Sequence, residues 1–386
     1  MKKFIVLLMA FFTVMFTFGT IYSFGILLPI MINDLELTKF EASLIIASNS
    51  IAYAIFAPIV SYLADRINEQ RVIITFLIIS GIGTLLMGFS NDKWFTCLSF
   101  AIIGAGSTVA WAPLISFLQK LFGRKVKGTI IGIMSSGDYI GYGILSIILP
   151  LLVYNYGWRS CWYILGIFLL IITIINKFVL RNEIKEYNSS YLEKFEVNYH
   201  KIFMKSNFWL IGISYMLMAF TITGPLNFIV TYANFEIGIS YSSSAALSGI
   251  IAFNALIGTL ILPMLSDIIG RKIMMIICNI VIGLCILVIP ISGSYLRMII
   301  ISLAILGIFY GGFYPIYAAS GSDYFPKNTS TVLGLWGTLH SIGAIIGISL
   351  FGLITDITES FHTSFYISAL FGIIATILLI PLKKSY

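Results

Sequence analysis

Long apolar runs alternate with short polar connections along the whole chain. Most runs approach the ~20 residues that a helix needs to cross a hydrocarbon layer of ~30 Å. Because that layer holds no water to bond free backbone groups, each run is expected to be helical. Membrane strands are excluded, since the runs show neither alternation nor a spacing of about ten residues. The pattern predicts twelve membrane spans, at about residues 4–30, 44–63, 72–90, 94–118, 128–152, 159–180, 207–234, 243–265, 273–291, 296–319, 330–354 and 362–382.

The first run, MKKFIVLLMAFF, begins like a secretory signal, with two lysines ahead of an apolar stretch. No small-residue cleavage site follows it, and the apolar residues continue to Pro29. A signal sequence is shorter and ends at such a site. We therefore expect the start of the chain to be the first membrane helix.

Composition places the chain among membrane proteins. It has 386 residues, of which 59% are hydrophobic and only 10% are charged, and its mean hydropathy is +1.00. One soluble core could not bury that much apolar surface. The predicted fold class is an all-α membrane protein that crosses the bilayer many times.

The net charge of +7 would suit a nucleic-acid partner, but the distribution of the charges argues otherwise. Starting from a cytoplasmic N-terminus, 19 of the 23 basic residues fall in the predicted inner segments. The outer segments hold only Lys39, Lys93, Arg159 and Arg297. This asymmetry follows the positive-inside rule and predicts that both termini are cytoplasmic. We expect no nucleic-acid partner, and a location in a bacterial inner (plasma) membrane.

The cysteines and histidines of the sequence do not form the patterns of a metal, redox or catalytic site. Four cysteines are present, none in a C-x-x-C pair: Cys97, Cys161, Cys278 and Cys285. Three histidines lie on separate segments: His200, His340 and His362. Such isolated residues are typical of packed positions rather than of metal ligands. No nucleophile, base and orienting group come together among the deep residues, so we expect no cofactor, no metal and no enzymatic activity.

An internal repeat is the strongest signal in the sequence. The polar stretch SYLADRINEQR at 61–71 is echoed by PMLSDIIGRK at 263–272, which places Asp65 and Asp267 202 positions apart. The same shift relates five further pairs: Leu63 and Leu265, Pro113 and Pro315, Gly132 and Gly334, Gly141 and Gly343, and Asp138 and His340. A repeat of this length indicates a duplicated six-helix unit.

The repeat predicts two pseudo-symmetric six-helix bundles in parallel repeat. They would span residues 1–180 and 207–386, joined by a polar cytoplasmic linker at 181–206. Two such halves around an axis along the membrane normal are the architecture of a rocking transporter. Its substrate site would lie near the midplane, between the halves.

The repeated polar stretch resembles the signature loop of the major facilitator superfamily. SYLADRINEQR is similar to the superfamily's loop between spans two and three, and PMLSDIIGRK is similar to the weaker copy between spans eight and nine. Ser61 and Asn68 stand where glycines are usual. The resemblance implies the major facilitator fold and a cytoplasmic gate formed by the charged residues of the two loops. These are Asp65, Arg66, Arg71, Asp267, Arg271 and Lys272.

Longer stretches resemble one branch of that superfamily. Residues 127–166, which contain KGTIIGIMSSGDYIGYG and end in GWRSCWYILG, resemble spans five and six of monocarboxylate and oxalate/formate-type carriers. Residues 331–370 resemble spans eleven and twelve, and YSFGILLPIMINDL at 22–35 resembles span one. The resemblance implies a monocarboxylate-type solute. The cationic residue common in span eight or eleven of that group is missing from SGIIAFNALIGTL, so a neutral or zwitterionic metabolite fits the charges as well.

Titratable groups deep in the membrane are expensive and therefore point to function. Asp138 lies about ten residues into the predicted fifth span, ~15 Å deep at ~1.5 Å per residue. No Lys or Arg is predicted at a comparable depth, and His340 takes the equivalent place in span eleven. Asp138 and His340 could each be a hydrogen-bonded group packed between two helices. We favour proton coupling or substrate contact, because an isolated acid in the membrane has few structural reasons to be there.

Further candidates come from the spans that line the cavity in the resembled superfamily. They are Tyr22, Trp111, Asn227, Tyr310 and Tyr314, together with Asn49 and Asn254 from the gating spans. Aromatic and amide groups suit a mostly apolar site with a few placed polar contacts. Packing or anchoring at the membrane surface is the alternative for each of them.

The sequence as a whole predicts a secondary active transporter that moves a small organic solute by alternating access. No nucleotide-binding motif appears, so we expect a gradient to drive it, with protons favoured because Asp138 and His340 are deep and titratable. We expect it to work as a monomer in the bilayer. Two alternatives stay open: a carrier of sugars, amino acids or drugs, and a transporter-like membrane sensor without net flux.

Overall fold

The computed structural model describes residues 2–66, 68–122, 127–180, 199–326 and 328–383. In these ranges the chain forms helices and no strand, which confirms the all-α class. The elements are α1 (Lys2–Asp34), α2 (Lys39–Arg66), α3 (Glu69–Gly88), α4 (Lys93–Ser107), η1 (Thr108–Ala110), α5 (Ala112–Phe122), α6 (Lys127–Leu180), α7 (Tyr199–Phe203), α8 (Ser206–Phe235), α9 (Tyr241–Ile269), α10 (Arg271–Ile291), α11 (Leu296–Tyr324), α12 (Thr329–Thr358) and α13 (Phe361–Leu379).

The predicted spans match these helices once two irregular places are considered. α6 has 54 residues, or ~80 Å at ~1.5 Å per residue, far more than one crossing needs. It bends at Gly157, where φ is 76° and ψ is 165°, a conformation that glycine adopts without strain. The fourth span is interrupted by η1 and Trp111, just before Pro113. Eleven helices of the described ranges are long and apolar enough to cross a membrane, and α6 supplies two crossings.

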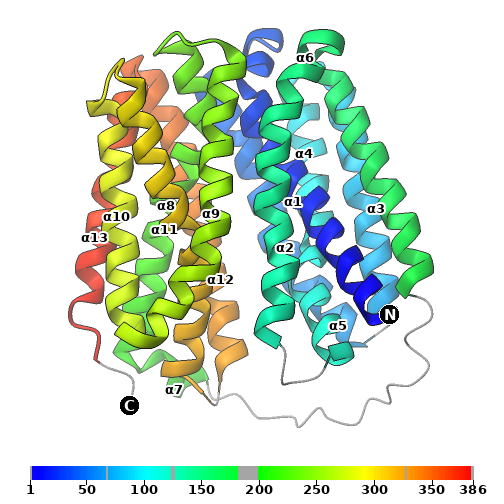
Figure 1. Cartoon of the computed structure of the whole chain (residues 1–386), viewed down its shortest axis with the longest axis vertical. Helices are drawn as coiled ribbons and strands as arrows, with labels where there is room; N and C mark the ends of the chain where they lie inside the picture. The colour runs from blue at the N-terminus through cyan, green and yellow to red at the C-terminus, as the bar shows by residue number, and fades with distance from the viewer. Residues whose placement is uncertain (1, 67, 123–126, 181–198, 327, 384–386) are drawn as a thin grey trace.

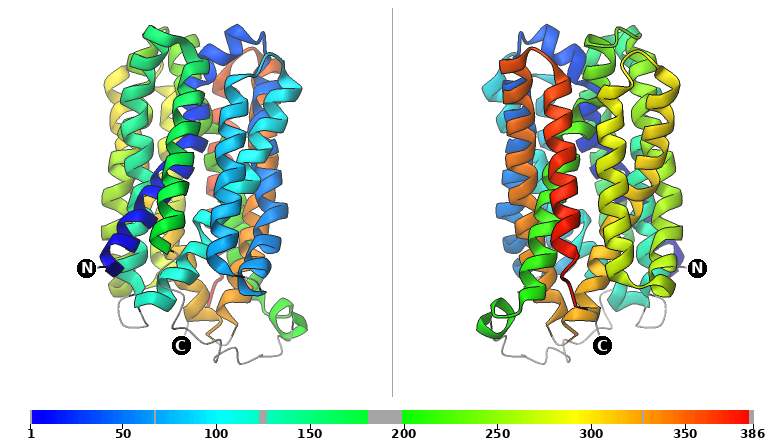
Figure 2. Two further views of the ribbon diagram at one scale, coloured as in Figure 1. Left: turned by 90° about the vertical axis from the view of Figure 1, so that its right-hand side faces the viewer. Right: turned by 90° about the vertical axis from the view of Figure 1, so that its left-hand side faces the viewer.

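The helices form two bundles that stand side by side. α1 to α6 make one bundle and α8 to α13 make the other (Figure 1). Views turned by 90° show that both chain ends lie at the same end of the molecule, which we call the terminus-bearing end (Figure 2). The predicted linker falls between α6 and α8, but its residues 181–198 lie outside the described residues. The domain boundaries at 180 and 207 therefore stay predictions.

Glycines related by the 202-residue shift play matching parts in the two bundles. Gly141 of α6 lies against a backbone carbonyl of α1, and Gly343 of α12 lies against a backbone carbonyl of α8. A Cβ at either position would overlap that oxygen. Gly132 and Gly334, also related by the shift, both face open space. The close approach of α6 to α1, and of α12 to α8, thus depends on small residues at corresponding places, as is common in membrane helices.

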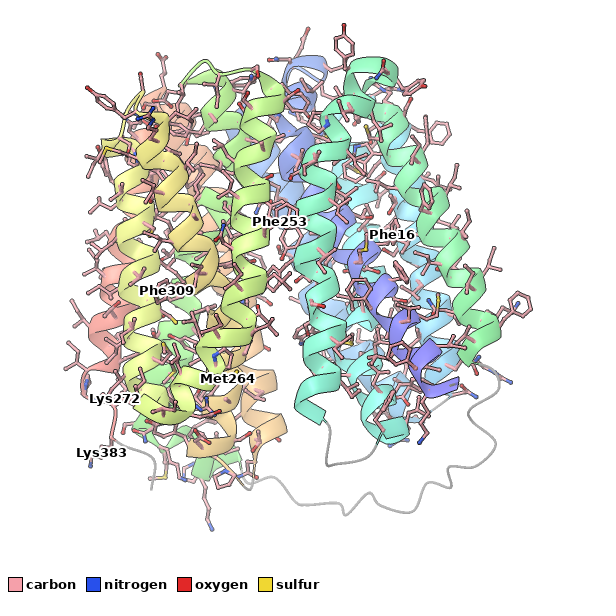
Figure 3. All side chains as sticks on the ribbon, in the orientation of Figure 1. Phe16, Phe253, Met264, Lys272, Phe309 and Lys383 are labelled. Carbon is pink, nitrogen blue, oxygen red and sulfur yellow. The ribbon has the colours of Figure 1, made fainter. Side chains whose placement is uncertain are left out.

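The most extensive contacts between the bundles are those of three helix pairs, α1 with α8, α2 with α12 and α6 with α9. A Cβ at Gly25 would lie 3.0 Å from the carbonyl oxygen of Asn227, and one at Gly143 would lie 2.8 Å from the ring of Phe253. Phe253 lies at the boundary between the bundles (Figure 3). These contacts are in the helix halves remote from the terminus-bearing end. Toward that end α6 and α9 diverge (Figure 3).

Candidate functional site

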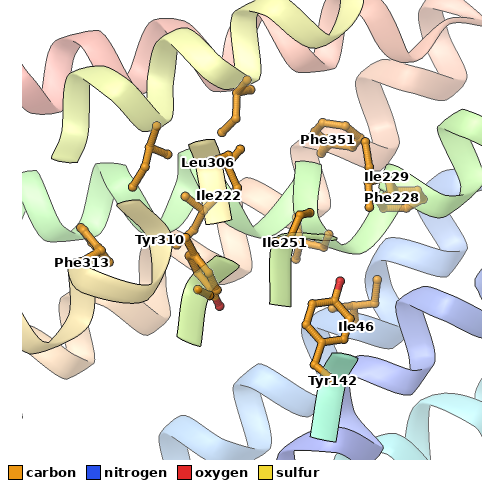
Figure 4. Close-up of a cluster of buried hydrophobic side chains, with 14 of the residues drawn as sticks. Ile46, Tyr142, Ile222, Phe228, Ile229, Ile251, Leu306, Tyr310, Phe313 and Phe351 are labelled. Carbon is orange, nitrogen blue, oxygen red and sulfur yellow. The ribbon is translucent and has the colours of Figure 1, made fainter. Parts of the chain in front are cut away.

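Six tyrosines gather where the two bundles meet, and we call them the central tyrosine cluster. Each bundle contributes three, all well inside their helices. The cluster consists of Tyr22 of α1, Tyr139 and Tyr142 of α6, Tyr215 of α8, and Tyr310 and Tyr314 of α11. Figure 4 shows two of them, Tyr142 and Tyr310, among the buried apolar side chains that surround the cluster.

Tyr22 joins the two bundles directly. Its hydroxyl lies 3.3 Å from the hydroxyl of Tyr310, so one of the two donates a hydrogen bond to the other. Its ring stacks on Tyr142, with the ring centroids 4.5 Å apart. Two of the three residues in this contact, Tyr22 and Tyr310, were predicted from the sequence, and the structure brings them together.

The other rings of the cluster stand edge-on to one another. Tyr139 and Tyr310 have their centroids 6.2 Å apart at an interplanar angle of 81°. Tyr310 and Tyr314 follow at 5.7 Å and 78°, and Tyr314 and Tyr215 at 6.3 Å and 81°. Aromatic pairs favour this geometry because the positive edge of one ring meets the negative face of the next. The four rings form a continuous aromatic wall across the boundary.

Asp138 lies beside this wall because of its position on α6. Gly137 and Gly141 lie against α1, and Gly143 lies against α9. Residues follow one another by about 100° around a helix. Asp138 and Tyr142 therefore lie between the face that packs on α1 and the face that packs on α9. On this face the ring of Tyr142 stacks on Tyr22, whose hydroxyl meets Tyr310 of the other bundle.

The carboxyl group of Asp138 has no hydrogen-bond partner among the described residues. Its Oδ1 atom is buried, and no described group makes a hydrogen bond to it. Asp138 directly precedes Tyr139 and lies one helical turn before Tyr142, so its carboxyl group is next to the cluster. Burying an acid in this way is costly unless a proton or a ligand satisfies it.

His340 closes the other end of the aromatic wall. Its ring centroid lies 4.6 Å from that of Tyr215 and 5.5 Å from that of Tyr314. Its Nε2 atom is buried and has no hydrogen-bond partner within the described ranges. Asp138 and His340, which the repeat pairs at the sequence level, thus flank one cluster from the two bundles.

The three predicted asparagines use their amides within their own bundles. Asn227 donates to the carbonyl of Thr223 one turn earlier, and Asn254 likewise to the carbonyl of Ile250. Asn49 is buried and donates over 2.9 Å to the carbonyl of Phe100 of α4. A part in solute binding stays a prediction for all three.

Trp111 lies at the break between η1 and α5. Its side chain is 37% exposed and stands edge-on to the ring of Phe18 on α1. Its backbone torsions, φ −113° and ψ −94°, are not helical. α11 is a continuous helix through Pro315, so the interruption before Pro113 is not matched in the other bundle.

Three members of the cluster were not predicted: Tyr139, Tyr142 and Tyr215. One signal was available, because Tyr142 follows Asp138 by four residues and therefore lies on the same face of the helix. Tyr215 had no such neighbour in the sequence. Its contact with His340 depends on how α8 packs against α12.

The described Lys and Arg side chains lie near the ends of helices and not in the central tyrosine cluster. Every Lys and Arg whose side chain the structure describes is within four residues of a helix end or of the bend at Gly157. The same holds for the described acids other than Asp138. In the described part of the chain, Asp138 therefore has no basic residue opposite it.

The charged residues of the predicted gate make contacts inside their own bundles. Arg271 donates to Asp267, Asp323 and Ser266, and Lys272 donates over 2.6 Å to the carbonyl of Ile380. These contacts tie the start of α10 to the ends of α9, α11 and α13.

In the other bundle, the guanidinium of Arg66 lies 4.9 Å from the ring centroid of Tyr62. The backbone N–H of Arg71 donates to Asn68, which caps α3. The side chain of Asp65 lies outside the described residues. A role of these residues in gating stays a prediction.

Comparison with known proteins identifies the family. The family model for the Major Facilitator Superfamily matches residues 10–265 and 211–386. "Monocarboxylate transporter 12" of Xenopus laevis is 24% identical to this chain, over 84% of the chain and 76% of that protein. "Probable nitrate transporter NarT" of Staphylococcus epidermidis is also 24% identical, over 93% of this chain and 91% of its own.

Among solved structures, a bacterial homolog of the human lysosomal transporter Spinster, in an inward-facing and unoccupied conformation, has the same fold. The TM-score is 0.82 at 17% identity, over 98% of this chain and 96% of the other. Relatives and fold are those of membrane transporters and not of enzymes. The two bundles, their repeated packing and the family match lead to one conclusion: this chain belongs to the Major Facilitator Superfamily and is a multi-pass membrane transporter of a small molecule.

Proposed function

We propose that this protein is a proton-coupled secondary active transporter of a small monocarboxylate-type metabolite. The observation that carries the proposal is the unpaired carboxyl group of Asp138, buried beside the central tyrosine cluster where the two bundles meet. Rocking of the bundles would expose this place to one side of the membrane at a time.

Proton coupling follows from the chemistry of that carboxyl. A charged carboxylate without a partner is unfavourable in a low-dielectric interior, whereas the protonated acid is tolerated. As the bundles rock, the carboxyl of Asp138 would release its proton when water reaches it and take up a proton when water is excluded. His340, at the other end of the aromatic wall, is the second group that can exchange a proton there.

A monocarboxylate suits both the relatives and the site. The relative from Xenopus laevis is named as a monocarboxylate transporter. The tyrosine hydroxyls and the imidazole of His340 can donate hydrogen bonds to a single carboxylate. Solutes with several negative charges fit less well, because no described Lys or Arg lies among these groups.

The positive-inside count assigns the terminus-bearing end to the cytoplasm. On that assignment the bundles contact each other on the outer side and diverge toward the inner side (Figure 1). The state is then inward-facing, as is the Spinster homolog of the same fold. The charged loop residues around Asp267 and Arg271 would contact the other bundle only in the outward-facing state.

Uptake into proteoliposomes tests the proposal. The panel contains lactate, pyruvate, glycine betaine, 4-trimethylammoniobutanoate and the carbon analogues of the last two, each labelled and compared with protein-free vesicles. We expect an imposed pH gradient to change the uptake of at least one compound several-fold. Asp138→Asn should abolish the effect of the gradient, and the exposed surface variant Glu359→Gln should keep it. A full gradient effect in Asp138→Asn, or no specific uptake of any compound, contradicts the proposal.

A further inference from the structure

We infer that the solute is a zwitterion, a carboxylate that also carries an ammonium group, and that the ammonium group binds between Asp138 and the central tyrosine cluster. This inference rests on the proposed function and narrows its substrate class. Three features of the structure lead to it: the charge balance of the site, the arrangement of the rings, and the placement of its two polar groups in different bundles.

When Asp138 is ionised, the charge balance of the site favours a cation on the solute. Asp138 contributes an unpaired carboxyl group, and the described Lys and Arg side chains all lie near helix ends or the Gly157 bend. A simple monoanion would bring a second negative charge to the ionised carboxylate, which is unfavourable at low dielectric, so it could bind only while Asp138 holds a proton. An ammonium group on the solute instead provides the missing partner, so that a buried charge is paired.

The rings of the cluster provide a suitable wall for that cation. Successive rings from Tyr139 through Tyr310 and Tyr314 to Tyr215 are turned by 78° to 81° relative to one another. Edge-on neighbours form corners, as in the aromatic cages that hold quaternary ammonium groups. The negative face of a tyrosine ring attracts a cation, and more strongly where water is excluded. Tyr22, whose hydroxyl contacts Tyr310, adds a second ring from the first bundle.

The two polar ends of the site suit the two ends of a zwitterion. Asp138 lies on α6 of the first bundle, and His340 lies on α12 of the second, with the aromatic wall between them. The buried Nε2 of His340 has no described partner and can donate to a carboxylate when it carries a proton. A zwitterion would therefore bridge the bundles, with its cation at Asp138 and its carboxylate toward His340.

The proton and the ammonium group compete for one carboxylate. Asp138 can hold a proton or pair with the cation of the solute, but not both together. Binding of the solute then displaces the proton, and exchange of solute for proton follows. Competition at Asp138 thus accounts for the proposed proton coupling with a zwitterionic solute, and no second titratable residue is needed.

Matched pairs of compounds isolate the ammonium charge. Glycine betaine and 3,3-dimethylbutanoate have the same shape and differ in a quaternary nitrogen against a quaternary carbon. A second pair, 4-trimethylammoniobutanoate and 5,5-dimethylhexanoate, has a longer spacing between the two ends. Binding of each compound to the purified full-length protein in nanodiscs is measured by calorimetry. We expect the nitrogen member of at least one pair to bind about 10-fold or more tightly than its carbon analogue.

Variants show whether that preference comes from the site. Asp138→Asn should reduce the preference to about twofold or less. Tyr310→Leu should weaken it several-fold, whereas Tyr310→Phe, which keeps the ring, should largely retain it. Correct folding is checked for each variant by its thermal unfolding and by size exclusion, and a variant that fails is replaced by the same change at Tyr314.

The outcomes separate this inference from the proposed function. The zwitterion assignment is overturned if both carbon analogues bind more tightly than their ammonium counterparts. It is also overturned if neither ammonium compound binds to the protein. Retention of the full nitrogen preference in Asp138→Asn overturns it as well. If the carbon analogues or lactate show gradient-dependent uptake that needs Asp138, the transporter proposal stands while the zwitterion fails. If the nitrogen preference is found without any effect of the pH gradient on uptake, the zwitterion assignment stands and the proton-coupled transporter proposal fails.

Discussion

The carboxylate of Asp356, near the end of α12, accepts a 2.7 Å hydrogen bond from the backbone N–H of Phe40 in the first turn of α2, in the other bundle. It accepts a second bond of 3.0 Å from the N–H of Lys39. The first N–H groups of a helix lack partners within the helix and carry partial positive charge. A carboxylate of one bundle thus caps a helix of the other. The residue 202 positions earlier, Tyr154, is exposed, so this cap is not repeated there.

Loss of the Asp356 carboxylate is expected to favour separation of the bundles at this end. Hydrogen bonds to charged groups contribute about 1.5–3 kcal/mol each to a fold or an interface. We predict that Asp356→Ala raises the labelling rate of a cysteine at position 43 by about 10-fold or more, because Ser43 is buried under α12. The measurement uses Ser43→Cys with the four native cysteines replaced by alanine.

Asp356→Asn should give an intermediate labelling rate, since one amide oxygen can still accept a bond. Glu359→Gln, an exposed acid three residues further on, serves as the control and should leave the rate unchanged. Equal rates in Asp356→Ala and in its parent would show that the cap does not hold the bundles together.

Glycines in close helix contacts should be sensitive to a single methyl group. Gly343→Ala places a Cβ against a backbone carbonyl of α8, which cannot move aside as a side chain can. We predict a loss of about 1–3 kcal/mol in stability from this overpacking. Thermal unfolding in detergent measures it as a lower midpoint.

A matched control comes from the same helix. Gly334→Ala places its Cβ in open space and should be neutral or stabilising by up to ~1 kcal/mol, because alanine favours helices over glycine. The repeat predicts the same contrast between Gly141→Ala and Gly132→Ala in the first bundle. Equal midpoints for the two members of either pair would refute this account of the packing.

Glu236 at the end of α8 should stabilise the start of α13. Its carboxylate accepts bonds of 2.7 Å from the hydroxyl of Ser360 and of 2.9 Å from the N–H of Phe361. Asp34, its equivalent in the repeat, accepts a 2.6 Å bond from Arg159 of its own bundle. We predict that Glu236→Ala costs about 0.5–2 kcal/mol, as loss of a helix cap does.

The effect of Glu236→Ala is read from the thermal unfolding midpoint, with Glu236→Gln as the conservative comparison. Gln keeps one acceptor oxygen and should recover part of the loss. Binding of the compounds described above should not change, because Glu236 lies at a helix end, away from the central cluster. A change in binding without a change in stability would contradict the assigned role.

Much of the candidate site could be predicted because charge in a membrane is rare. Asp138 and His340 were found from depth and from the repeat, and both flank the cluster in the structure. Tyr22, Tyr310 and Tyr314 were also predicted, and they are members of it. Tyrosine is common enough in this chain, with 21 residues, that the sequence could not distinguish the members of the cluster from those that anchor helices at the membrane surface.

The sequence by itself determined the helices, their number and their duplication. Hydrocarbon leaves each apolar run no other way to satisfy its backbone, so the local pattern is sufficient. Only the tertiary structure decided which faces meet. Tyr215 reaches His340, and Asp356 reaches the start of α2, through contacts between helices more than 100 residues apart in the chain. Packing of that kind depends on the shapes of both surfaces at once, and no local pattern encodes it.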